Sequence, residues 1–186
     1  MEAPKTFRLD LGPDLSRDLP IITLRGRDKQ IASFVMLGDV ELNKKCAAYL
    51  VEKMRKQGLL EKFDYLVTIE AKGITLAHEV AALLNYNRFV VIRKTAKKYM
   101  QRPLMVPSES ITSGGNQTIV LDGLDIDRLR GKRVCLVEDV IATGGSVEAA
   151  CNLINAVGAE VAVIAAVLLK GDFDDPRLVY LASPEM

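Results

Sequence analysis

The sequence has few of the residues that mark disulfide-rich or metal-binding proteins. It holds three cysteines and a single histidine, His78, in 186 residues. The odd count and the spacing of Cys46, Cys135 and Cys151 fit neither a zinc site nor a CxxC pair. We therefore expect buried thiols in a reducing compartment, and no metal held directly by protein side chains.

Long apolar runs and a strong net charge are also missing. No stretch approaches the ~20 uncharged apolar residues that a membrane helix needs, and Met1 to Asp10 lacks the apolar core of a secretory signal. The formal net charge of +1 gives no indication of a nucleic-acid partner. We expect a cytoplasmic protein that binds neither membranes nor nucleic acid, and whose length suits one domain with a full core.

Apolar segments alternate with helical patterns through most of the chain. The patterns predict helices over residues 40–57, 76–84 and 147–157, and strands over 65–69, 89–92, 118–121, 134–137, 160–169 and 178–181. Strands that are apolar on both faces and alternate with helices indicate a parallel sheet covered on both sides. Right-handed crossovers then give a doubly wound, mainly parallel α/β domain.

Two segments lack this alternation. Residues 1–38 contain Pro4, Pro13 and Pro20, and we predict irregular structure there with two short candidate strands, 21–22 and 31–37. Residues 93–116 form a long polar segment. Loops of such length in a compact domain tend to be lids or disordered segments.

The strongest motif follows the strand predicted at 134–137. Glu138 and Asp139 are adjacent carboxylates at its carboxyl end, where α/β domains bind ligands, and strand alternation turns one of them more directly toward a ligand. Carboxylates accept hydrogen bonds from sugar hydroxyls, and a glycine-rich helix start offers amides to a phosphate. That helix start is the small-residue loop Ala142, Thr143, Gly144, Gly145 and Ser146. The segment is complementary to a sugar phosphate, whereas the GxxxxGK[ST] and GxGxxG motifs are absent.

Two further groups of residues suit an anion. The strand predicted at 65–69 ends in Glu70, Ala71, Lys72 and Gly73, which combine small residues with a cation before a helix. The polar segment opens with the cations Arg93, Lys94, Lys97 and Lys98. A mobile basic arm of this kind would close over a leaving anion, neutralise its charge and exclude water.

The segment from Val134 to Ser146 resembles the phosphoribosyl pyrophosphate (PRPP) signature of type I phosphoribosyltransferases, and the resemblance covers roughly residues 60–181. It implies one domain over residues 1–186, with a hood at 1–38 and a core at 39–186 that carries a mobile arm at about 93–117. It implies transfer of ribose 5-phosphate from PRPP to a base, in a homodimer. Mg²⁺ would bind through the phosphates of PRPP rather than through protein ligands.

The resemblance also assigns roles to residues. Glu138 and Asp139 would hold the ribose hydroxyls and act in catalysis with Lys72 and Arg93. The implied PRPP-binding set is Ala71, Lys72, Gly73, Arg93, Lys94, Lys97, Lys98, Glu138, Asp139, Ala142, Thr143, Gly144, Gly145 and Ser146. The family often has a non-proline cis peptide in the second loop, expected here between Ala71 and Lys72.

The expected base is a purine, with adenine as the first choice. Residues 70–73 are close to the Glu-Ala-Arg-Gly of the adenine enzymes, and Phe34 of the hood is a candidate to stack on the ring. The arm of the adenine enzymes carries a Glu-Tyr pair before a glycine, where alignment on Gly114 gives Thr112-Ser113 here. This difference keeps open a non-catalytic PRPP- or nucleotide-binding regulator of purine metabolism. A subunit whose fold serves only assembly, and orotate as the substrate, are further alternatives.

Overall fold

The centre of the protein is a parallel sheet of five strands. The computed structural model describes residues 5–23, 30–109 and 116–184. The strand order is β10-β9-β8-β4-β5, and every neighbouring pair is parallel. The bounds are β4 Tyr65–Ile69, β5 Val90–Ile92, β8 Arg133–Ile141, β9 Glu160–Leu169 and β10 Leu178–Ala182. The predicted doubly wound α/β class is confirmed.

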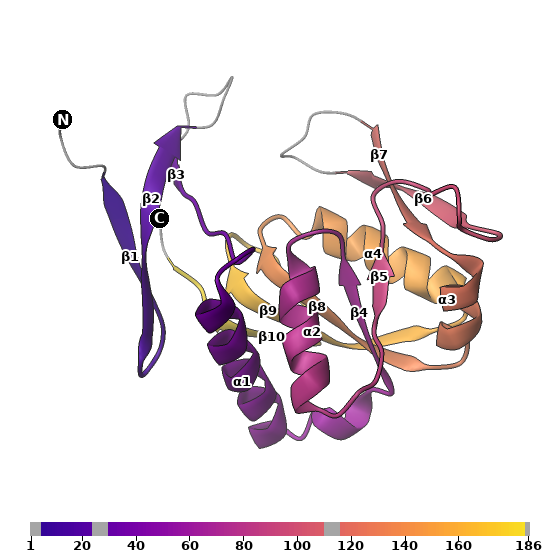
Figure 1. Ribbon diagram of the computed structural model, residues 1–186, viewed down its shortest axis with the longest axis horizontal. Coiled ribbons are helices and arrows are strands. Elements are labelled where there is room, and N and C mark those ends of the chain that lie inside the picture. The colour runs from indigo at the N-terminus through magenta and orange to yellow at the C-terminus, as the bar shows by residue number, and fades with distance from the viewer. Residues whose placement is uncertain (1–4, 24–29, 110–115, 185–186) are drawn as a thin grey trace.

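Both faces of this sheet are buried, because side chains along each strand alternate between two cores. Cys135 and Val137 pack on one side with the first helices, whereas Val134 and Leu136 pack on the other. Helices α1 and α2 cover the first face and α3 and α4 the second (Figure 1). Their bounds are α1 Val40–Lys56, α2 Gly73–Leu83, α3 Gly123–Leu129 and α4 Gly145–Ala156.

The strand order places the loops after β4 and β8 side by side. The chain passes from β4 through α2 to β5 on one side, and later returns to β8 on the other side of β4. Such a reversal leaves a crevice beyond the carboxyl ends of the two strands, where α/β proteins bind ligands. The register pairs Thr68 with Val137, so that Ile69 and Glu138 lie next to each other at this edge.

The N-terminal region forms a sheet of its own, so the prediction of irregular structure is wrong for residues 6–23, although the candidate strands 21–22 and 31–37 overlap two of the observed strands. Three antiparallel strands are present: β1 Thr6–Gly12, β2 Leu15–Thr23 and β3 Gln30–Ala32. Phe7, Leu9 and Leu11 alternate with polar residues along β1, and the last two are buried in the α1 core. The alternation of apolar and polar residues therefore produces strands in spite of the prolines, and Pro20 itself lies within β2 opposite Thr6.

The polar segment also holds regular structure that the sequence did not predict. Strands β6 (Leu104–Glu109) and β7 (Asn116–Leu121) pair antiparallel as a hairpin beside the main sheet (Figure 1). Only the last part of it, 118–121, was expected as a strand. The Thr112-Ser113 pair and Gly114 fall outside the described residues. Within the described part of the chain, no helix has the length and apolar character to span a bilayer.

Asp39 helps to join the N-terminal sheet to the first helix. Asp39 is the N-cap of α1, and its Oδ1 accepts a hydrogen bond from the Leu42 amide at 2.9 Å. The same carboxylate accepts from Arg17 of β2, with Nε 2.8 Å from Oδ2 and Nη2 3.1 Å from Oδ1. The Arg17 guanidinium, ahead of the Leu42 amide, holds the pKa of Asp39 below its ordinary value of 3.8.

Replacing Asp39 with alanine should lower the free energy of unfolding by about 1–2 kcal/mol at pH 7, because both the helix cap and the ion pair are lost. Serine at this position should cost about half as much, since it keeps the cap. A carboxylate with a lowered pKa stabilises the fold above its ordinary pKa and loses that effect as the pH falls through the lowered value. The difference in free energy of unfolding between wild type and Asp39→Ala, measured in urea, should therefore shrink as the pH falls below the ordinary value of 3.8. A difference that stays the same at low pH would show that the charge of Asp39 does not contribute to the free energy of unfolding.

Candidate active site

The two predicted acids lie inside strand β8 rather than beyond its end. We expected Glu138 and Asp139 to emerge where the strand leaves the core, but β8 continues to Ile141, and the two residues are only 9% and 5% exposed. Glu138 Oε1 accepts a hydrogen bond from the Ile69 amide at 2.9 Å. Asp139 Oδ2 is buried and has no hydrogen-bond partner within the described ranges. Since an unpaired buried carboxylate oxygen is costly, Asp139 is the acid that a ligand hydroxyl would satisfy.

Burial raises the pKa values of both acids above those of ordinary surface carboxylates. Burial, helped by the neighbouring Asp139, raises the pKa of Glu138 to about 8, although the Ile69 amide opposes the shift. Burial also raises the pKa of Asp139, while the charges of Lys72 and Lys94 lower it. The pKa of Glu138 thus lies far closer to neutral pH than that of an exposed carboxyl group.

The small-residue loop after β8 leads directly into helix α4. Gly144 is the N-cap of α4 with φ of +81°, a conformation that other residues rarely adopt. A Cβ at this position would collide with the ring of Phe173. Within the described residues no side chain caps α4, so the amides of its first turn stay available to an anion. Ala142 and Thr143 are exposed, while Gly145 and Ser146 are half-buried.

The loop after β4 lies against the same acids. Gly73 begins α2, and a Cβ there would collide with Thr68 Oγ1 and come 3.4 Å from Glu138 Oε1, so the glycine allows helix and strands to approach closely. Ala71 and Lys72 are exposed. The cis peptide bond lies between Glu70 and Ala71, so the expected position is wrong by one residue. Neither bond precedes a proline, and the residue types alone do not distinguish them.

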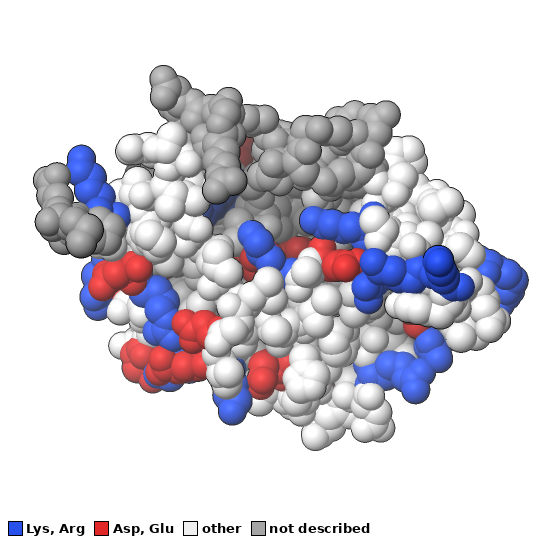
Figure 2. All heavy atoms as spheres, turned by 45° about the horizontal axis from the view of Figure 1, so that its top comes forward, with Lys and Arg blue, Asp and Glu red and all other residues white. Residues whose placement is uncertain are grey.

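The start of the polar segment is fixed to this loop through Glu70. Its Oε2 accepts hydrogen bonds from Arg93 Nε at 2.8 Å and from the Lys94 amide at 3.0 Å. Burial raises the pKa of Glu70, but the Lys94 amide, Arg93 and Lys97 together bring it below its ordinary value. Lys97 Nζ donates to Thr95 Oγ1 at 2.8 Å, and Lys98 is exposed. Figure 2 shows acidic and basic side chains next to one another in the middle of this face.

The structure adds a cation that the sequence analysis missed. Lys170 directly follows β9, and its amide donates to the Ile141 carbonyl at 2.7 Å. Its Nζ donates to the carbonyl of Ala32 in β3 at 3.1 Å, which ties the N-terminal sheet to the carboxyl edge of the main sheet. Burial, followed by the charge of Lys72, lowers the pKa of Lys170. The sequence offered one indication of this role: Lys170 directly follows the long apolar run 160–169, as the ligand-binding residues of an α/β domain follow its strands.

Phe34, the candidate for base stacking, and His78, the single histidine, both pack against other side chains. Phe34 is 5% exposed and packs in the core with α1, which favours a packing role, so stacking on a base stays a prediction. His78 stands edge-on to Phe89, with ring centroids 6.4 Å apart. No group of three or more histidine, cysteine or acidic residues able to hold a metal occurs within residues 5–23, 30–109 and 116–184.

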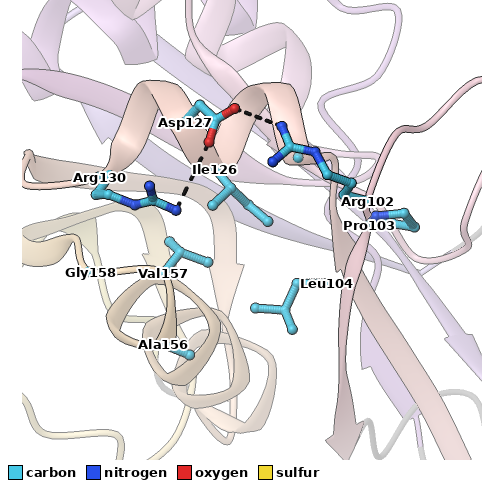
Figure 3. Close-up of a pocket in the computed structure, with 10 residues that line it drawn as sticks. Arg102, Pro103, Leu104, Ile126, Asp127, Arg130, Ala156, Val157 and Gly158 are labelled. Atoms are coloured by element: carbon cyan, nitrogen blue, oxygen red, sulfur yellow. Dashed lines mark hydrogen bonds and ion pairs between the residues drawn. The ribbon is translucent and has the colours of Figure 1, made fainter.

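Two hollows in the surface of the described structure are not lined by the predicted site residues. One of about 550 Å³ lies between α3, the end of α4 and the start of β6, where Arg102 and Arg130 flank Asp127 at 2.8 and 3.9 Å (Figure 3). Another, of about 310 Å³, lies along α4 beside Phe173. Neither is lined by Glu138, Asp139 or Lys72. We place the candidate site at the ends of β4 and β8, because the charged groups converge there.

Comparison with known proteins gives one family. The family model of the phosphoribosyl transferase domain matches residues 39–177. HGPRTase-like protein 3 of Haloterrigena turkmenica is 37% identical over 127 residues, which are 67% of this chain and 63% of that protein. An adenine phosphoribosyltransferase of Prochlorococcus marinus is 32% identical over 115 residues, 61% of this chain and 62% of that protein. The chain thus matches a little under two thirds of the length of these relatives.

A solved structure shows the same fold. The adenine phosphoribosyltransferase of Thermoanaerobacter pseudethanolicus superposes with a TM-score of 0.65 at 22% identity, and the match covers 89% of this chain and 95% of that one. The similarity extends beyond residues 39–177 and therefore includes part of the N-terminal region or of the tail.

The raised pKa of Glu138 predicts an unusual pH dependence of stability. A carboxyl group whose pKa is about 8 when folded and 4.5 when unfolded stabilises the protein at low pH and loses this effect as the pH rises toward 8. Glu138→Gln keeps an oxygen for the Ile69 amide but cannot ionise. Its free energy of unfolding, relative to wild type, should rise between pH 5 and 8 by up to about 1.4 kcal/mol per pH unit. If the free energies of unfolding of wild type and Glu138→Gln, measured in urea, differ by a constant amount between pH 5 and 8, the raised pKa of Glu138 is contradicted.

Proposed function

Because the chain belongs to the phosphoribosyl transferase domain family, we propose that it transfers ribose 5-phosphate from PRPP to a purine base in purine salvage. The products are pyrophosphate and a nucleoside monophosphate. One observation carries the proposal: a buried oxygen of Asp139, which has no hydrogen-bond partner among the described residues, lies five residues before Gly144, the N-cap of α4. Acceptors for a ribose and donors for its phosphate thus follow each other on one short segment.

Each loop has a part in this proposal. Asp139 accepts from a ribose hydroxyl, and Glu138, held by the Ile69 amide, contacts the neighbouring hydroxyl. The 5′-phosphate lies on the amides and hydroxyls of residues 142–146. The pyrophosphate lies against Ala71, Lys72 and Gly73, with the cations Arg93, Lys94, Lys97 and Lys98 along the arm.

The reaction is a displacement at the ribose C1 atom. The bond from C1 to the pyrophosphate oxygen breaks, and the pyrophosphate leaves with the electron pair. A bond forms between C1 and a ring nitrogen of the base, which loses its proton. Positive charge develops on the ribose as in glycoside chemistry, so the protein's main tasks are to hold the ribose, stabilise the leaving anion through Lys72 and Arg93, and exclude water.

Magnesium fits this site through the substrate rather than through the protein. The described residues offer two adjacent carboxylates but no set of three metal ligands. Mg²⁺ commonly binds substrate phosphates and water with few protein ligands. Bound in this way, it would neutralise charge on the pyrophosphate, while Glu138 and Asp139 remain for the ribose.

The base, the hood and the assembly are parts of the same proposal. Strands β1 to β3 act as the hood over the base, and the bond from Lys170 to the Ala32 carbonyl holds the hood beside the site. Adenine is the first choice of base, and the name of the Haloterrigena relative makes hypoxanthine and guanine the next. We place the enzyme in the cytoplasm as a homodimer.

A panel of bases tests the proposal. Pyrophosphate release is measured from PRPP and Mg²⁺ with adenine, hypoxanthine, guanine, xanthine and orotate in turn. Release with a purine is expected and names the substrate, whereas release with orotate alone would overturn the purine assignment. Tight PRPP binding in calorimetry without release would favour the regulator, in line with Thr112-Ser113 in place of a Glu-Tyr pair.

Asp139→Asn should lower kcat/KM for PRPP by about 10- to 100-fold, because a hydrogen bond to a charged group is worth about 1.5–3 kcal/mol. The free energy of unfolding should stay the same or rise, since a buried carboxylate without a partner is removed. Glu61→Gln, a change at an exposed acid with no hydrogen bond in the described structure, serves as the control. Unchanged turnover in Asp139→Asn would remove Asp139 from the ribose site.

A further inference from the structure

Glu70 is an acid at the edge of a site that should attract anions. It directly follows β4 and precedes the proposed pyrophosphate loop Ala71–Gly73. A free carboxylate there would repel the phosphates of PRPP. Its side chain is only 22% exposed, and Oε2 already accepts from Arg93 Nε at 2.8 Å and from the Lys94 amide at 3.0 Å. The charge of Glu70 is thus engaged by the start of the arm.

Arg93 is held by its backbone as well as by its side chain. Its amide donates to the Val120 carbonyl at 2.9 Å, and its carbonyl accepts from the Val120 amide at 2.7 Å. The Glu70 amide donates to the Ile92 carbonyl at 2.8 Å, which joins β4 to the residue before Arg93. Only Nε of the guanidinium is engaged within the described residues, so the two Nη groups remain available.

The backbone of Lys94 is held by the same carboxylate. Its amide is fixed by Glu70, while the charge on its side chain acts on both Glu138 and Asp139 and lowers the pKa of each against the effect of burial. The charge of the ammonium group thus acts on the acids that would hold the ribose. A single carboxylate thus fixes the origin of two cationic side chains.

We propose that Glu70 is a positioning residue, whose carboxylate sets Arg93 and Lys94 beside the pyrophosphate loop so that their free cationic groups meet the pyrophosphate. This inference rests on the proposed function. It makes Glu70 favourable for PRPP binding although its charge has the wrong sign for direct contact. A bidentate fork such as guanidinium binds phosphate well only when its orientation is fixed.

Two variants of Glu70 separate positioning from simple charge. Glu70→Met keeps the length of the side chain but loses both the charge and the acceptor, whereas Glu70→Gln loses the charge and keeps one acceptor for Arg93 and Lys94. Positioning predicts that the Kd for PRPP with Mg²⁺ rises about tenfold in Glu70→Met and by less than about threefold in Glu70→Gln. A purely electrostatic role predicts that both variants bind PRPP as tightly as wild type or more tightly, because a negative charge is gone.

A double-mutant cycle tests whether Glu70 acts through Arg93. In an Arg93→Ala background, Glu70→Met should raise Kd by clearly less than tenfold, because only the contact to the Lys94 amide remains to be lost. Glu61→Gln should leave Kd unchanged. A full tenfold effect of Glu70→Met in the Arg93→Ala background would overturn the inference, as would tighter binding in either single variant.

Thermal unfolding shows whether a variant is folded, and titration of the wild type with PRPP distinguishes failure of this inference from failure of the proposed function. If Glu70→Met does not fold, the effect is measured on Glu70→Asp, which keeps the charge but is one methylene shorter. This variant should bind PRPP more weakly than wild type, and unchanged binding would overturn the inference. If wild type binds PRPP and the Glu70 variants bind equally well, the inference fails and the proposed function stands. If wild type does not bind PRPP, both fail.

Discussion

The hydrogen bond from the Ile69 amide to Glu138 Oε1 joins the ends of the two strands on which the site is built. It forms only because β4 and β8 are neighbours and end at the same edge of the sheet. Gly73 makes the arrangement possible, since any side chain there would meet Thr68 and approach Glu138. The loop that follows each strand then begins from a fixed point, and both loops face the same crevice.

The cost of burying two adjacent acids explains the charges around them. Burial raises the pKa of Glu138 and of Asp139, and Lys72 and Lys94 act against the shift at Asp139. Lys170 stands close enough to Lys72 for the two charges to oppose each other. In the free protein the buried carboxylates and the neighbouring lysines are both energetically unfavourable. A ligand with hydroxyl groups would give the carboxylates hydrogen-bond donors, and its phosphates would neutralise the lysines.

The sequence predicted what depends on periodicity and on short motifs. The buried strands, α1, and the loop at 142–146 followed from apolar runs and from glycines before a helix. The N-terminal sheet was missed because its prolines outweighed a clear alternation along β1, and β6 and α3 are short or polar. Glu70 and Lys170 could not be predicted in their present roles, since their partners Arg93 and Ala32 are distant in the chain. Such contacts depend on the strand order.

Hydrogen–deuterium exchange with and without PRPP and Mg²⁺ tests the location of the site most directly. A PRPP site at the ends of β4 and β8 predicts slower exchange of the amides in residues 144–147 and 71–74 when PRPP is added. The hollow between α3 and α4, lined by residues 102–104 and 156–158, should exchange as before. Protection at that hollow, with unchanged exchange in both loops, would contradict the site.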